Sequence, residues 1–301
     1  MTASISSVIQ AHLTWLQLRR QPKTVEFYRY THQKLAAFLH GSDLKLDHVT
    51  STTADQYAVW LGQQGLSKLT MRHCVAALCA LCRWAHTEGF LKRNPLQGYV
   101  KPKATPEPIT GYRQEEVSAL IRSCSQKSKG KRDLAMLLFL YDTGVRSSEL
   151  CSLTVGDVDT IRCSAIIRHG KGDHSRVVIY SQITATSLRK YLAGVHADGD
   201  NPAAPLFPGR GSEPMTRHGV YSLIKRLASE AGLGSQRLGA HRLRHAMAEA
   251  TLVAGGNIRF LQEQMGHRDL STLQRYTRFS EESMRQMREQ TSPVAKLKGI
   301  R

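Results

Sequence analysis

The chain has 301 residues, 41% of them hydrophobic, which is enough for two domains with their own cores. Lysine and arginine number 42 against 24 aspartates and glutamates, a formal net charge of +18 that favours a polyanionic partner over a merely basic, soluble protein. No stretch reaches the ~18 apolar residues of a membrane helix, and the amino terminus does not resemble a signal peptide, so we expect a cytoplasmic protein without a membrane partner.

Positive charge is spread along the whole chain. Residues 1–104 carry 13 basic and 5 acidic side chains, or +8, which leaves +10 for the remainder. A basic tail on a neutral body would look different, so both halves are expected to face the same polyanion. In an interaction with a phosphate backbone, several basic side chains are candidate contacts: Arg19, Arg20, Lys23, Lys68, Arg72, Arg83 and Arg217.

The first hundred residues read as helices. Apolar residues recur at helical spacing over 8–20, 22–41, 51–65 and 68–90, with cap residues or glycines at several boundaries. The last run contains Cys74, Cys79 and Cys82. Their spacing fits no common zinc pattern, and cysteines on an apolar helix face are typically buried thiols, so we expect no metal there. The proline-rich segment 101–112 is the best linker, and it predicts a helical domain over 1–104 and a second domain over 105–301.

The second half combines helical patterns with two β-rich runs. Helices are expected over 110–125, 131–144, 184–195 and 221–232. The runs SAIIRH and RVVIYS, over 164–169 and 176–181, flank GKGDHS and predict a hairpin with Lys171 near its tip. The chain is therefore expected to be mainly α-helical with a small β-sheet in its second domain.

Cations and one tyrosine gather around short helices near the carboxyl end. In HRLRH, His241 and Arg244 are three residues apart and share a helix face, and Arg242 and His245 share the next one. Helix periodicity alone does not distinguish which of the two pairs belongs to a site. A glycine pair at 255–256 ends this helix, and Asn257 is the expected cap of a short helix that Gly266 terminates. The next residue, His267, is then placed in a tight turn, and a third segment carries Tyr276.

An earlier turn adds another cation. Gly144 is expected to break a buried helix, so that Arg146 lies at the turn. Glu149 could pair with a cation or cap the helix that follows. Each of these residues alone is commonly structural, and Lys171 alone is typical of a solvated turn. Their combination in one chain is what indicates a phosphate-binding site.

The whole pattern resembles the tyrosine recombinase family, the phage integrases and Xer-type recombinases. That family's catalytic residues follow the order Arg, Lys, His-x-x-Arg, His or Trp, and Tyr. This chain offers, in that order, Arg146, Lys171, His241, Arg244, His267 and Tyr276. The resemblance covers essentially the full length, and it implies a C-shaped DNA clamp with a helical, SAM-like core-binding domain in front of an α+β catalytic domain.

The resemblance also implies a chemistry. Tyr276 would be the nucleophile that forms a 3′-phosphotyrosine, with His241 as its base and Lys171 as the acid for the departing 5′ oxygen. Arg146 and Arg244 would hold the non-bridging oxygens, and His267 would hydrogen-bond the phosphate. The family needs no ATP, metal or other cofactor, and its only substrate is double-stranded DNA rather than a small molecule.

Partners and alternatives follow from the same resemblance. The family works as a tetramer on two DNA sites, made of one recombinase or of two different ones, and the residues after Tyr276 would dock into a neighbouring protomer. A type IB topoisomerase uses similar Arg, Lys and Tyr chemistry, and a DNA-binding protein without catalysis is a third reading. The sequence favours site-specific recombination, serving integration, excision or dimer resolution, in the nucleoid-bearing cytoplasm.

Overall fold

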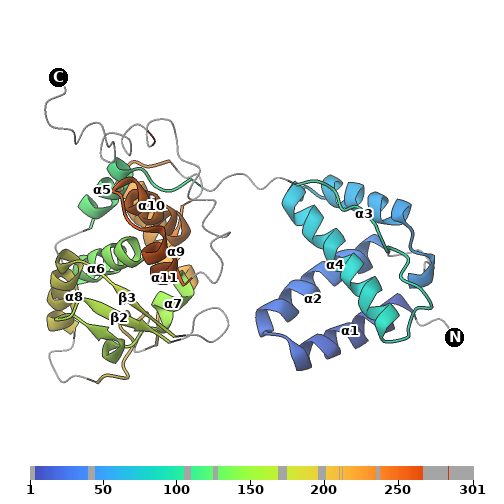
Figure 1. Ribbon diagram of the computed structural model, residues 1–301, viewed down its shortest axis with the longest axis horizontal. Coiled ribbons are helices and arrows are strands. Elements are labelled where there is room, and N and C mark those ends of the chain that lie inside the picture. Colours follow the sequence, from blue (N-terminus) through green and yellow to red (C-terminus); the bar gives the residue numbers. More distant parts are fainter. Residues whose placement is uncertain are drawn as a thin grey trace, which may run out of the picture. The chain divides into compact units, whose positions relative to one another are not determined.

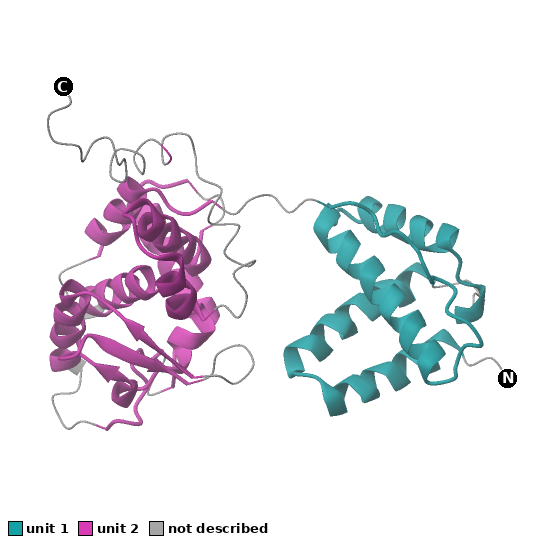
Figure 2. Cartoon of the chain, in the orientation of Figure 1, with its two compact units in different colours: residues 1–108 teal, residues 109–301 magenta. Residues whose placement is uncertain are grey.

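The chain divides into two compact units, Met1–Pro108 and Ile109–Arg301 (Figure 2). The structure, a computed structural model, describes residues 4–39, 45–104, 110–124, 128–168, 175–195, 201–209, 211, 213–234, 238–266 and 284. Figure 1 shows helices in the first unit, and helices around a small sheet in the second. No helix among these residues is long and apolar enough to cross a membrane.

The first unit is built from the helices that the sequence predicts. Its elements are α1 (Ile5–Arg19), α2 (Pro22–Phe38), the 3₁₀ turn η1 (Leu46–His48), α3 (Ser51–Gln63) and α4 (Lys68–Thr87). Polar side chains start three of the helices: Ser4, Thr50 and Ser67 each accept a hydrogen bond from a backbone N–H in the first turn of α1, α3 and α4.

Helix α4 forms the centre of this unit. It contacts α1, α2 and α3, and Val75, Leu81 and Ala85 on it are fully buried. The cysteines Cys74, Cys79 and Cys82 are buried too, as expected for thiols on the apolar face of a helix. Burial raises the pKa of the Cys82 thiol to about 12, which keeps this side chain protonated.

Three of the candidate phosphate contacts, Arg19, Arg20 and Arg72, have partners within this unit. The Arg72 guanidinium donates from Nη1 to the carbonyl of Pro102 at 2.8 Å, so it holds the beginning of the linker against α4. Arg19 lies over the ring of Trp15, with Cζ 5.1 Å from the ring centroid.

A pair of buried histidines joins α1 to α2. His12 Nδ1 and His32 Nε2 lie 2.9 Å apart, and both side chains are almost fully buried beside Tyr28 and Trp84. Burial lowers the pKa of His12 from 6.5 to about 4, and burial with the neighbouring His12 lowers that of His32 to about 3. The native pair is therefore neutral at physiological pH.

Mild acid is expected to destabilise this unit. When folding lowers the pKa of a histidine, the unfolded chain binds the proton first as the pH falls. The stability contributed by that histidine is therefore complete above pH 6.5 and is lost as the pH falls towards the pKa of the folded state. We expect the free energy of unfolding to fall by roughly 2–4 kcal/mol between pH 7 and pH 5. All three tryptophans, Trp15, Trp60 and Trp84, belong to this unit, so their fluorescence during urea unfolding reports on it alone.

The matched variant removes both imidazoles. In the double variant His12→Phe, His32→Leu the dependence on pH between 7 and 5 should largely disappear, because neither replacement titrates. If the double variant keeps the dependence of the natural chain, other groups are responsible for it.

The second unit surrounds a three-stranded sheet with helices (Figure 1). Its elements are α5 (Gln114–Arg122), α6 (Ser128–Thr143), α7 (Ser147–Ser152), η2 (Val155–Asp157), β1 (Val158–Asp159), β2 (Ser164–Ile167), β3 (Arg176–Ile179), α8 (Gln182–Val195), α9 (Arg217–Glu230), α10 (Ala240–Val253) and α11 (Ile258–Met265). The expected fold class, mainly helical with a small sheet, is confirmed. The two-residue strand β1 and the short helical turns are too brief to leave a periodic signal.

The sheet has the order β1-β2-β3 and is antiparallel throughout. Strands β2 and β3 pair from Ser164 with Ile179 to Ile167 with Arg176, which confirms the predicted pairing of these two runs. Its connection, with Lys171, lies outside the described residues. Strand β3 is an edge strand, and its open side meets α11.

Candidate active site

Arg146 lies where α6 gives way to α7. Gly144 follows the last residue of α6 with a φ of +62°, and a Cβ atom there would collide with the terminal methyl group of Met247. Arg146 is the N-cap residue of α7, and its backbone N–H donates to Glu149 Oε2 at 2.8 Å. Its side chain is 34% exposed. The sequence left two functions open for Glu149, and it performs both, because it also pairs with cations.

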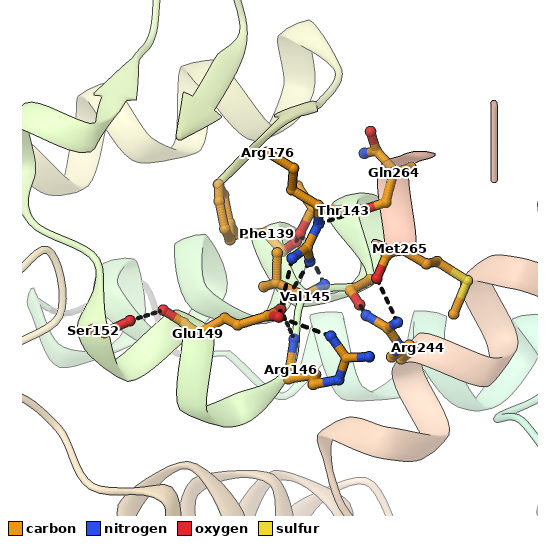
Figure 3. Close-up of polar contacts among 11 residues, drawn as sticks. Phe139, Thr143, Val145, Arg146, Glu149, Ser152, Arg176, Arg244, Gln264 and Met265 are labelled. Carbon is orange, nitrogen blue, oxygen red and sulfur yellow. Dashed lines mark hydrogen bonds and ion pairs between the residues drawn. The ribbon is translucent and has the colours of Figure 1, made fainter. Parts of the chain in front are cut away.

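Glu149 is a buried carboxylate between two guanidinium groups (Figure 3). Arg146 Nη1 donates to Oε1 at 2.8 Å. Arg176 donates from Nη1 to Oε1 at 3.0 Å and from Nη2 to Oε2 at 2.8 Å, the bidentate fork geometry. Burial by itself would raise the pKa of Glu149, but the hydrogen bonds and charges of Arg176 and Arg146 outweigh it and lower that pKa to about 2. The carboxylate is therefore ionised at neutral pH.

Arg176 also connects strand β3 to the end of α11. Its Nε donates to the carbonyl oxygen of Gln264 at 3.1 Å. The Gln264 side chain pairs in turn with the open edge of β3: Oε1 accepts from the Ile179 N–H at 3.1 Å, and Nε2 donates to the Ile179 carbonyl at 2.6 Å. A side-chain amide thus satisfies backbone groups that an edge strand would otherwise leave to water.

Arg244 is a buried arginine on α10. It is 2% exposed, and its guanidinium donates to two backbone carbonyls from distant segments, those of Gly144 and Met265, the latter at 2.8 Å. Gly144 is two positions before Arg146 in the chain, and Met265 is the last residue of α11. Cations suit this position because the carbonyls at a helix carboxyl end have no partner within the helix.

The end of α11 is a tight left-handed turn. Gly266 has a φ of +63°, and a Cβ atom there would lie 2.9–3.0 Å from the Arg176 side chain. This confirms the stop predicted at Gly266, and the cap predicted at Asn257 is confirmed by the bond that its side chain accepts from the Arg259 N–H. Arg176 therefore packs directly against the residue that precedes His267 in the chain.

His241 lies in the first turn of α10, next to a second histidine. The Nε2 atoms of His241 and His245 lie 3.3 Å apart, with their rings edge to face. His241 and Arg244 share one side of α10, as the spacing in HRLRH predicts, and the contact with His241 places His245 on that side rather than on the next face with Arg242. His245 is 6% exposed, so the pair is partly withdrawn from water.

The structure brings three of the six predicted site residues to one region. Arg244 bonds the carbonyl of Gly144, two positions before Arg146, and His241 lies on the same helix as Arg244. The other three, Lys171, His267 and Tyr276, lie outside the described residues, as does the predicted docking segment after Tyr276 apart from Met284. Arg176 and Gln264 were not predicted, because a single arginine at the start of a strand and a glutamine on a helix carry no periodic signal.

This arrangement is suited to binding a phosphate. Two fixed guanidiniums, one buried and one partly exposed, keep their charge at any working pH and match phosphate oxygens in geometry. Among the described residues, no group of three or more His, Cys, Asp or Glu side chains could hold a metal ion. Arg146, Arg176 and Arg244 supply positive charge in this part of the site.

Glu149 is expected to stabilise the second unit in a way that depends on pH. Its pKa is about 2 in the folded protein against 4.5 for the ordinary group, so its contribution is complete above 4.5 and is lost as the pH falls from there towards 2. The shift corresponds to roughly 3 kcal/mol. We expect Glu149→Gln to be less stable than the natural chain at pH 7, with the difference shrinking by pH 3. Circular dichroism during urea unfolding at both pH values measures it, and a difference independent of pH would contradict the expectation.

Known proteins resemble this chain in sequence and in fold. Residues 112–283 match the family model described as the phage integrase family, and residues 4–104 match the phage integrase SAM-like domain. The tyrosine recombinase XerA of Thermococcus kodakarensis is 31% identical, over 98% of both chains. XerD of Vibrio cholerae is 29% identical over 93% of this chain and 94% of its own. The fold also resembles the integrase of the transposon Tn1549 in complex with transposon right end DNA, with a TM-score of 0.77 at 19% identity, covering 96% of this chain and 99% of that one.

Proposed function

Because this chain belongs to the phage integrase family of tyrosine recombinases, we propose that it is a site-specific recombinase whose Tyr276 cuts DNA strands by forming a 3′-phosphotyrosine. The tyrosine oxygen attacks the scissile phosphorus, the bond to the 5′ oxygen breaks, and that oxygen leaves as a hydroxyl group. Religation by the 5′-hydroxyl of a partner strand reverses the step and releases the tyrosine. The covalent bond conserves the energy of the phosphodiester, so the reaction needs neither ATP nor a metal.

Each remaining site residue has a place in this reaction. Arg146 and Arg244 stabilise the charge that gathers on the non-bridging oxygens in the transition state. His241 takes the proton of Tyr276, whose unperturbed pKa is about 10 and which therefore needs a base. Lys171 protonates the 5′ oxygen, and His267 hydrogen-bonds the phosphate. The single observation that supports this best is the convergence of Arg146 and Arg244 on the turn after Gly144.

The domains and partners follow the family. Residues 1–104 form the helical core-binding domain, and residues 105–301 form the catalytic domain with a carboxyl-terminal segment that is exchanged between protomers. The relatives are named as recombinases, and one solved structure similar in fold contains its DNA. We propose a tetramer, of one recombinase or of two, assembled on two DNA sites in the cytoplasm where the nucleoid lies.

Covalent trapping tests the proposal. Binding selection from random duplexes first identifies the preferred DNA. A duplex of that sequence, nicked close to the scissile bond, releases a short 5′-hydroxyl fragment on cleavage and leaves the protein attached. After denaturation and digestion, mass spectrometry is expected to find a nucleotide on the peptide with Tyr276. An adduct on another tyrosine would overturn the site assignment, and tight binding without any adduct would indicate a DNA-binding protein without catalysis.

A second measurement separates recombination from topoisomerase activity. A site-specific recombinase exchanges strands between two duplexes that carry the selected site, and ignores supercoiled plasmid without it. Relaxation of plasmid that lacks the site, without any recombinant product, would favour the type IB topoisomerase.

A further inference from the structure

We propose that Arg176 is a positioning residue of this active site, which occupies the carboxylate of Glu149 so that Arg146 keeps its positive charge for the scissile phosphate. The inference deepens the proposed function and rests on it. It assigns a purpose to an ion pair that joins strand β3, helix α7 and the end of helix α11 (Figure 3).

A carboxylate lies beside the proposed phosphate site because Glu149 also caps helix α7. Glu149 Oε2 accepts the backbone N–H of Arg146 and so fixes the first turn of α7. The same side chain, 2% exposed, brings a negative charge into contact with the Arg146 guanidinium. A Glu149–Arg146 pair without any further partner would be neutral, and a neutral pair attracts a phosphate weakly.

Arg176 changes this balance. Two guanidiniums on one carboxylate leave a net charge of +1 instead of zero. Arg176 engages both oxygens of Glu149, whereas Arg146 uses only Nη1. In the described part of the chain, the Arg146 side chain makes no other hydrogen bond and remains 34% exposed, so its other nitrogens can face a ligand.

The position of Arg176 is fixed independently of Glu149. Its Nε is held by the Gln264 carbonyl at 3.1 Å, its side chain packs against Gly266, and it is only 12% exposed. Because the Gln264 carbonyl, Gly266 and burial all hold the Arg176 side chain, its guanidinium has little freedom to leave the Glu149 carboxylate. Without Arg176, each Glu149 oxygen would lose a donor, and Arg146 could turn its whole fork onto the carboxylate and away from the phosphate.

The test compares four proteins in single-turnover cleavage of the nicked duplex: the natural chain, Arg176→Met, Arg176→Lys, and the double variant Arg176→Met, Glu149→Gln. We expect Arg176→Met to cleave about 10- to 100-fold more slowly, because Glu149 then neutralises Arg146. Arg176→Lys keeps the charge and should lose much less. The double variant should be faster than Arg176→Met by at least about fivefold, because removing the negative charge restores the positive charge at the phosphate.

The double variant separates positioning by charge from mere structural support. If Arg176 only holds the fold together, removing a second member of the network makes cleavage slower or leaves it unchanged, and the proposal is wrong. Arg226→Met is the matched control, because Arg226 also pairs with a buried carboxylate, that of Asp133, at 2.5 Å. The Arg226→Met variant should be less stable than the natural chain but should cleave at the natural rate. Stability and cleavage rate are measured on the same preparations.

Failure of this inference is distinct from failure of the proposed function. If the natural chain forms no covalent adduct, the proposed function is wrong and the inference falls with it. If the natural chain forms the adduct and Arg176→Met forms it at the same rate, the function stands and Arg176 has no positioning effect.

Discussion

The Tyr276→Phe variant is expected to bind its DNA site as tightly as the natural chain and to form no covalent adduct. The substitution removes one oxygen atom, the one that would attack phosphorus, and leaves the rest of the side chain unchanged. Other site residues cannot replace a missing nucleophile, so cleavage in the nicked duplex should fall by at least about 10³-fold. Gel separation of the protein–DNA adduct under denaturing conditions measures it directly.

A second tyrosine provides the control for this variant. Tyr221 lies on α9, is 44% exposed and belongs to the same unit. Tyr221→Phe should form the adduct at the rate of the natural chain. Loss of the adduct in both variants would point to a general effect on the fold, and persistence of the adduct in Tyr276→Phe would mean that the nucleophile is a different residue.

Arg244→Lys is expected to have the second largest effect, and to affect both chemistry and stability. Lysine keeps the positive charge but presents it at a single nitrogen, so it cannot reach the carbonyls of Gly144 and Met265 and also the phosphate. A buried carbonyl left without a donor costs about 1–3 kcal/mol. The loss of one donor to the transition state typically slows such a reaction by about 10²- to 10³-fold.

These two consequences are measured separately. Urea unfolding followed by circular dichroism gives the stability, and single-turnover cleavage at saturating protein gives the chemical step. DNA affinity should change little, since many other phosphate contacts contribute to it. A variant that is less stable but cleaves at the natural rate would show that Arg244 only supports the fold.

The neighbouring Arg242 is a close structural match for Arg244. It also lies on α10 and donates to two carbonyls, those of Thr110 and Gly111, while its guanidinium stacks on the Tyr112 ring at 4.1 Å. Arg242→Lys therefore removes similar contacts at the start of the second unit without touching the turn after Gly144. It should lose less stability than Arg244→Lys, because the carbonyls it contacts are less buried, and should retain cleavage within about threefold.

Local features of the sequence were sufficient for much of the fold. The helices of the first unit and the β2–β3 pairing were predictable because hydrophobic periodicity, capping residues and turn residues act over a few positions. The stops at Gly144 and Gly266 belong to the same class, since each glycine has a positive φ that other residues avoid. The order of catalytic residue types also identified the family, which the comparisons confirm.

The contacts that organise the site were decided only by the tertiary structure. Arg176 meets Glu149 across 27 positions and Gln264 across 88, and Arg244 meets Gly144 across 100. No local pattern encodes such pairs, because each residue alone is compatible with an exposed surface position. The sequence by itself determined which residue types could bind and attack a phosphate. Packing of α7, α11 and β3 then decided that Arg176 engages both oxygens of the buried Glu149 carboxylate, whereas the Arg146 guanidinium engages one.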